Sequence, residues 1–94
     1  MSYNDTMKLS SKHQKTFLAI FDDPVRSDIE WTDIENMLHA LGGDVSEGRG
    51  SRVRVHLNGV RAVFHRPHPQ KETEKGAIKS MRRLLIEAGM HLGE

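Results

Sequence analysis

The stretch RVRVHLNGVRAVFHR, residues 52–66, decides the fold. Residues 52–57 alternate strictly between polar and apolar, which is the pattern of a β-strand with one buried face. Asn58-Gly59 is the strongest two-residue hairpin signal, because both positions of a type I′ turn need positive φ. Residues 60–66 then return as a second strand. The sequence therefore predicts a tight antiparallel hairpin.

The two-residue turn also fixes which residues face each other across the hairpin. One face is then wholly apolar and must lie under the helices; it consists of Val53, Val55, Leu57, Val60, Ala62 and Phe64. The opposite face carries Arg52, Arg54, His56, Arg61, Val63 and His65. Cations that face one another across strands repel, so stability alone does not account for this composition. It favours binding of an anion over the alternative of an ordinary solvated face.

Helical patterns flank the hairpin on both sides. A short helix is predicted over residues 11–21, and a second from Thr32, where Glu35 three residues later would form a capping box. A strand over residues 44–47 would complete a three-stranded antiparallel sheet, and an amphipathic helix spans residues 75–88. The predicted fold class is therefore α+β, with an N-terminal helix, then α-β-β-β-α, and the helices packed on one face of the sheet.

The composition limits the classes of protein that the chain could belong to. Its 94 residues allow one small domain, which we place at residues 11–94 after a flexible N-terminus at residues 1–10. No segment approaches the roughly 20 apolar residues of a membrane-spanning helix, and the N-terminus lacks the apolar stretch of a signal peptide. The sequence has no cysteine, so we expect no disulfide and a cytoplasmic location.

The charges are unevenly distributed along the chain. Residues 1–48 hold four Lys/Arg against nine Asp/Glu, a net −5, whereas residues 49–94 hold ten against four, a net +6. This asymmetry favours an anionic partner for the second half. The GRGSR loop, with Arg49, could bring backbone amides close to a phosphate. The start of the last helix, with Lys75 and Lys79 nearby, is a second candidate seat for phosphate.

The stretch HRPHP, residues 65–69, raises the question of a metal site. His65 and His68 are three residues apart, but the prolines prevent the helical turn that usually makes such a pair converge. A structural zinc site needs four ligands, and the chain has no cysteine to supply them. We therefore predict neither a metal nor a small-molecule cofactor. A Ser-His-Asp hydrolase is not supported either, because the sequence has no nucleophile elbow.

Several pieces of sequence follow one another between residues 31 and 90: the helix DIENMLHALGG, the strand entry GRGSRVRV, the NG turn, PHP, and KGAIKSMRRLLIEAGM. In this order they resemble the HicA toxin family of bacterial type II toxin–antitoxin systems. The resemblance implies a fold like that of double-stranded-RNA-binding domains. It also implies ribosome-independent cleavage of mRNA, and neutralisation by a HicB antitoxin.

The sequence departs from the family at one position. Many HicA toxins carry a histidine, held to be catalytic, directly after the Gly-Ser of the strand entry; here that residue is Arg52. Since His65 faces Arg52 across the hairpin, His65 is the candidate base or acid, and Arg52 and Arg54 are the candidates to stabilise negative charge. The alternative for His65 is a half-buried strand histidine that packs beside an arginine. His68 is either its partner or only a loop residue. The expected RNA contacts are Arg49, Ser51, Arg54, Arg61, Arg66, Lys75, Lys79 and Arg82.

Two other functions stay open. With Arg52 in place of the usual histidine, the chain could be a non-catalytic RNA-binding module, or a decayed toxin that only binds its antitoxin. It could also be a protein-interaction module whose basic surface meets an acidic protein and never meets RNA.

Overall fold

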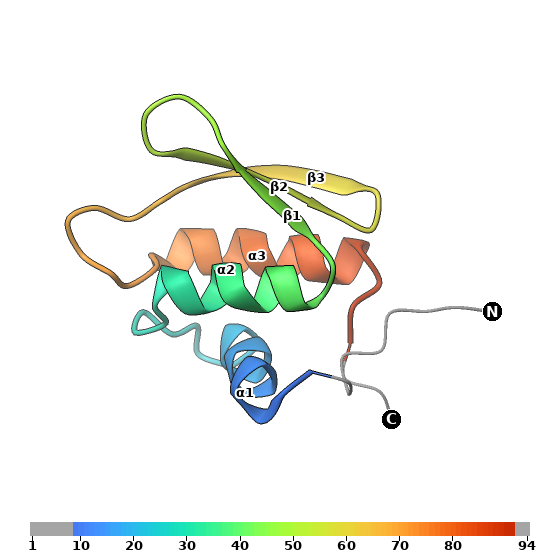
Figure 1. Cartoon of the computed structure of the whole chain (residues 1–94). Coiled ribbons are helices and arrows are strands. Elements are labelled where there is room, and N and C mark those ends of the chain that lie inside the picture. Colours follow the sequence, from blue (N-terminus) through green and yellow to red (C-terminus); the bar gives the residue numbers. More distant parts are fainter. Residues whose placement is uncertain (1–8, 92–94) are drawn as a thin grey trace.

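A computed structural model describes residues 9–91, and Figure 1 shows the course of the chain. Most of the predicted flexible N-terminus, residues 1–10, lies outside the described residues. The elements are α1 (Ser11–Ile20), α2 (Trp31–Ala40), β1 (Asp44–Glu47), β2 (Arg52–Leu57), β3 (Val60–His65) and α3 (Lys75–Glu87). The predicted α+β class and the predicted order of elements are confirmed.

The β2–β3 hairpin has the predicted register. All six expected pairs are present, from Leu57 opposite Val60 at the turn to Arg52 opposite His65 at the far end. The turn residues have φ values of 50° and 85°, as a type I′ turn requires. Strand β1 runs antiparallel along the other side of β2, so the strand order is β1-β2-β3.

The molecule is built in three layers (Figure 1). Helices α2 and α3 both lie beneath one face of the sheet, with α2 against β1 and α3 against β3, and α1 lies on the far side of these two helices. The core is formed by apolar side chains from all three layers, including Phe17, Ile20, Ile34, Met37, Leu38, Val53, Val55, Leu57, Phe64, Ile78, Met81 and Leu85. Among the described residues, no helix is both long and apolar enough to cross a membrane.

The start of α2 differs from the prediction. The N-cap of α2 is Glu30 and not Thr32, where the sequence predicts a capping box. The Glu30 side chain makes no capping hydrogen bond. The reason lies elsewhere in the chain: the Trp31 N–H donates to the Lys71 carbonyl at 3.0 Å, which keeps the preceding residue extended. The Glu35 carboxylate accepts a hydrogen bond from Trp31 Nε1 and is therefore not available as a cap.

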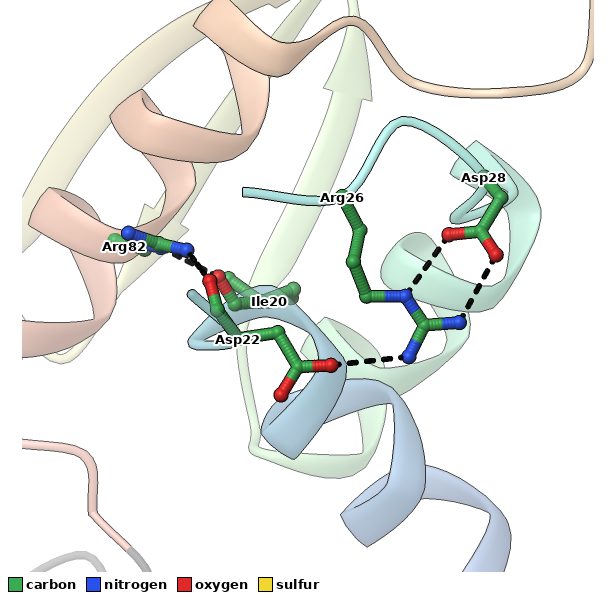
Figure 2. A network of polar contacts seen from close by, with 5 residues as sticks. All are labelled: Ile20, Asp22, Arg26, Asp28 and Arg82. Atoms are coloured by element: carbon green, nitrogen blue, oxygen red, sulfur yellow. Dashed lines mark hydrogen bonds and ion pairs between the residues drawn. The ribbon is translucent and has the colours of Figure 1, made fainter. Parts of the chain in front are cut away.

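The C-terminal end of α1 is anchored on α3 by an arginine (Figure 2). The Arg82 guanidinium donates to the Ile20 carbonyl at 2.5 Å and to the Asp22 carbonyl. Beside it, Arg26 makes two hydrogen bonds to the Asp28 carboxylate, at 2.9 and 3.0 Å, and one to Asp22 at 3.2 Å. The hydrogen bonds from Arg26 lower the pKa of Asp28 below its usual value. The segment after α1 is thus tied to α3 at its start by Arg82 and braced internally by Arg26.

Replacing Arg82 by alanine is expected to lower the free energy of unfolding by about 1–3 kcal/mol, because two carbonyl groups lose a charged donor. Urea denaturation followed by circular dichroism measures this loss. Arg83→Ala is the matched control, since Arg83 is an exposed neighbour on the same helix, and it should change stability by less than about 0.5 kcal/mol. Equal losses in the two variants would contradict the anchoring role of Arg82.

Candidate nucleic-acid interface

The sheet face that points away from the helices, here called the open face, carries its side chains in rows across the strands, and all but one of them are polar. The rows are Asp44–His56–Arg61, Ser46–Arg54–Val63 and Arg52–His65. All eight residues are exposed. Three arginines and two histidines therefore share this face with a single carboxylate, as the predicted register requires.

A hollow of about 400 Å³ lies on the open face. Its lining consists of Asp44, Ser46, Arg54, Val55, His56, Arg61, Ala62 and Val63. Val63 is 58% exposed and lies among the charged residues of this face. An apolar patch flanked by arginines suits a nucleic-acid strand, whose bases have apolar faces and whose backbone is anionic.

A second cavity, of about 170 Å³, lies where β3 leads into α3, and we call it the histidine pocket. It is lined by His65, Arg66, Pro67, His68, Gln70, Thr73, Glu74 and Ala77. The structure thus brings His65 and His68 to one cavity, although the prolines between them exclude a helical turn. The cavity is smaller than the sites that hold drug-sized ligands, so it suits a single small group.

Thr73 in the histidine pocket has a buried hydroxyl that sequence reasoning missed. The residue is 2% exposed, and within residues 9–91 its Oγ1 has no hydrogen-bond partner. Its backbone N–H donates to the Ile29 carbonyl at 2.8 Å, which fixes its position. A buried hydroxyl without a partner costs about 1–3 kcal/mol. No sequence pattern signals such a site, because the identity of a threonine does not tell whether its hydroxyl is paired.

Arg66, expected to contact RNA, is held by two carboxylates. It donates to Glu35 from Nε at 3.0 Å and from Nη2 at 2.8 Å, and to Glu47 from Nη1 at 2.8 Å. The hydrogen bonds to Glu47 and Glu35 raise the pKa of Arg66. Its backbone N–H donates to the Ser51 carbonyl at 2.8 Å. Arg66 therefore joins the end of β3 to α2 and to the β1–β2 loop, and its charge is compensated.

The other expected RNA contacts lie in three places. Arg49 and Ser51 are exposed in the β1–β2 loop, whose tight turn places Gly50 at φ 61°. Lys75 and Lys79 are exposed on α3, beside the histidine pocket but not lining it. Arg82 lies away from both cavities and anchors α1. In the described part of the chain, no three potential metal-binding side chains (His, Asp or Glu) come together.

Comparison with protein families agrees with this arrangement. A family model described as HicA toxin of bacterial toxin–antitoxin matches residues 31–90, from the start of α2 to just beyond α3. The chain belongs to the HicA toxin family. It is therefore a toxin of the toxin–antitoxin type, and α1 lies outside the part that defines the family. Comparisons of this HicA chain with curated proteins and with solved structures find no match.

The Glu35–Arg66 contact is expected to stabilise the fold more than the Glu47–Arg66 contact. The Glu35 side chain is only 18% exposed, whereas that of Glu47 is 71% exposed. Glu35→Gln should lower the free energy of unfolding by about 1–3 kcal/mol, and Glu47→Gln by less than about 1 kcal/mol. Urea denaturation of both variants tests this order. A loss for Glu47→Gln as large as that for Glu35→Gln would show that burial does not decide the strength of the contact.

Proposed function

We propose that this HicA-family toxin cleaves mRNA in the cytoplasm and thereby inhibits translation. The observation that carries the proposal is the position of the histidine pocket. His65 belongs both to the pocket and to the last row of the basic open face. An RNA strand that follows the cations of that face would bring its phosphates to two imidazoles.

Two histidines are sufficient for the chemistry of metal-free RNA cleavage. We assign His65 as the base that takes the proton from the 2′-hydroxyl, whose oxygen then attacks phosphorus. The bond from phosphorus to the 5′-oxygen breaks, His68 donates a proton to that oxygen, and a 2′,3′-cyclic phosphate remains. Arg52, opposite His65 in the register, and Arg54 in the next row would stabilise the charge that develops on the phosphoryl oxygens.

The proposed RNA-binding surface is smaller than the sequence suggested. It keeps the loop residues Arg49 and Ser51, Arg54 and Arg61 on the open face, and Lys75 and Lys79 on α3. We leave out Arg66 because its charge is compensated by two carboxylates. Arg82 is left out because it donates to carbonyl groups at the end of α1.

The same face is the proposed docking site of a HicB-like antitoxin. Its three arginines call for a partner surface with an excess of carboxylates, and the exposed Val63 offers an apolar contact within it. A protein that covers the open face would also cover the route to His65. Neutralisation then needs no change in the shape of the toxin.

A second function is favoured by one residue. Arg52 stands where many HicA toxins carry their catalytic histidine, and arginine cannot exchange a proton at neutral pH. The protein would then bind RNA without cleaving it. RNA binding that weakens steeply with salt, in the absence of any cleavage product, would identify this function.

His65→Ala is expected to abolish growth arrest on induced expression and to lower the rate of RNA cleavage by about 10²–10⁴, the usual contribution of a general acid or base. Cleavage of a single-stranded RNA by purified protein measures the rate. His39→Ala, an exposed histidine on α2, is the control and should behave as wild type. If His65→Ala is folded and still cleaves RNA at the wild-type rate, the assignment of His65 is wrong.

A further inference from the structure

We propose that the outer edge of β3, together with α3, binds an extended acidic segment of the antitoxin as a fourth strand of the sheet. The choice of the antitoxin as partner rests on the proposed function. The place and conformation of the segment rest on the backbone of β3 and on a groove beside it, neither of which the docking site on the open face requires.

The first observation concerns the backbone of β3. This strand ends the sheet, so no strand within residues 9–91 pairs with its outer side. In a hairpin with a two-residue turn, the residues that flank the turn exchange hydrogen bonds, and every second residue after them does the same. The even-numbered residues of β3 therefore bond to β2, and the Arg66 N–H continues the series with its bond to the Ser51 carbonyl at 2.8 Å. The N–H and C=O groups of Arg61, Val63 and His65 point outward.

The outer edge of β3 also lacks several features that usually keep an edge strand from pairing. Such features include proline, a β-bulge and a very short strand. Strand β3, which the structure describes over its whole length, has six residues, no proline, and residue-for-residue pairing with β2. Its polar side chains are Arg61 and His65, and between them lies Val63, which is 58% exposed. Arg61 opposes a basic strand at this edge but attracts an acidic one.

The second observation is a groove of about 220 Å³ beside this edge, here called the edge groove. It is lined by residues 60–64 of β3 and by Ser80, Arg83, Leu84 and Glu87 of α3. The three polar residues of α3 are exposed and lie three and four positions apart, so they share one side of the helix. Addition of an extended segment to a sheet edge is a recurring mode of peptide recognition. The edge supplies backbone hydrogen bonds, and every second side chain of the segment can enter the groove.

The charges around the edge select an acidic occupant. Arg61 and Arg83 line the edge groove from β3 and from α3, and Glu87 is the one carboxylate among the described residues of the lining. The opposite edge strand, β1, has the sequence DVSE, with two carboxylates and no Lys or Arg. An acidic segment is therefore attracted to β3 rather than to β1. A second copy of the chain is disfavoured, because it would bring together two halves that each carry a net +6.

A fourth strand at this edge would also contribute to neutralisation of the toxin. The edge ends at His65, the proposed base of RNA cleavage. A segment that pairs along β3 therefore reaches the residue on which the proposed chemistry depends. The antitoxin would hold the toxin by backbone hydrogen bonds and crowd His65 with the same contact.

Hydrogen exchange of the amides of β3 tests the fourth strand, measured by NMR on the free toxin and on its complex with the HicB-like antitoxin. In the free toxin the outward amides of Arg61, Val63 and His65 should exchange rapidly, whereas those of Ala62 and Phe64, which bond to β2, should be protected. In the complex, exchange of the outward amides should slow by at least about tenfold.

The other outcomes of this measurement separate the fourth strand from the proposed function. Unchanged exchange of the outward amides in a complex that does form would overturn the fourth strand and leave docking on the open face standing. The absence of any complex would overturn both. Outward amides that are already protected in the free toxin would place a second copy at the edge and overturn the choice of occupant.

Val63→Pro removes one outward N–H and no hydrogen bond to β2, and edge strands tolerate proline at such positions. Val63→Ala is the matched control, because it also lacks the valine side chain but keeps the N–H. Val63→Pro should bind the antitoxin about 10–100-fold more weakly than Val63→Ala, since a carbonyl group of the added segment loses its donor. Isothermal titration calorimetry measures both affinities, and circular dichroism checks both folds. Equal affinities of the two folded variants would overturn the fourth strand.

Arg83→Glu tests the charge of the added segment. It should weaken binding at least about tenfold more than Lys79→Glu, because a like charge then faces the segment inside the groove. Lys79 is exposed on the same helix but does not line the edge groove, so its variant makes the same change in net charge. Equal losses in the two variants would show that the groove does not meet carboxylates, and would overturn an acidic occupant.

Discussion

A two-residue turn with both residues at positive φ allows a single register of the β2–β3 hairpin. Asn58 and Gly59 supply that turn, and a slip of one residue would move every apolar side chain of a strand to solvent and every arginine into the core. The turn is also tied to the helical layer, because Asn58 Nδ2 donates to the Ala88 carbonyl at the end of α3, at 2.6 Å. The apolar core and the basic open face thus follow from the same constraint.

The opposite end of the hairpin has no such turn, and it is held by tertiary contacts instead. Arg66 joins the end of β3 to Glu35 of α2 and Glu47 of β1. A few residues later, the chain is bound to the segment before α2 through the Thr73–Ile29 hydrogen bond. The connection that carries His68 runs between these two attachments. The histidine pocket is therefore built on fixed points, although most of its lining residues lie between β3 and α3, outside helices and strands.

The difference between the turn, which is set by local sequence, and the far end, which is held by tertiary contacts, explains what could be predicted from the sequence. The strands, their register and the apolar faces depend on neighbours in the chain, and alternation and turn chemistry report them directly. The hydrogen-bond partners of the arginines depend instead on residues far away in the sequence. Arg66 binds Glu35, 31 positions away, and Arg82 binds the Ile20 carbonyl, 62 positions away. Both arginines therefore looked like free cations. The capping box predicted at Thr32 was wrong for the same reason, since a distant loop sets where α2 begins.

Helix α1 adds a constraint that the family match does not include, because it lies before residue 31. It packs against α2 and α3 on the side away from the sheet, so part of the outer surface of these helices is occupied by the chain itself (Figure 1). The open face, by contrast, is covered by no other described element. The charges act in the same direction, because residues 1–48 carry a net −5 and residues 49–94 a net +6. A polyanion is therefore attracted to the second half of the chain, which supplies the arginines of the face where His65 lies.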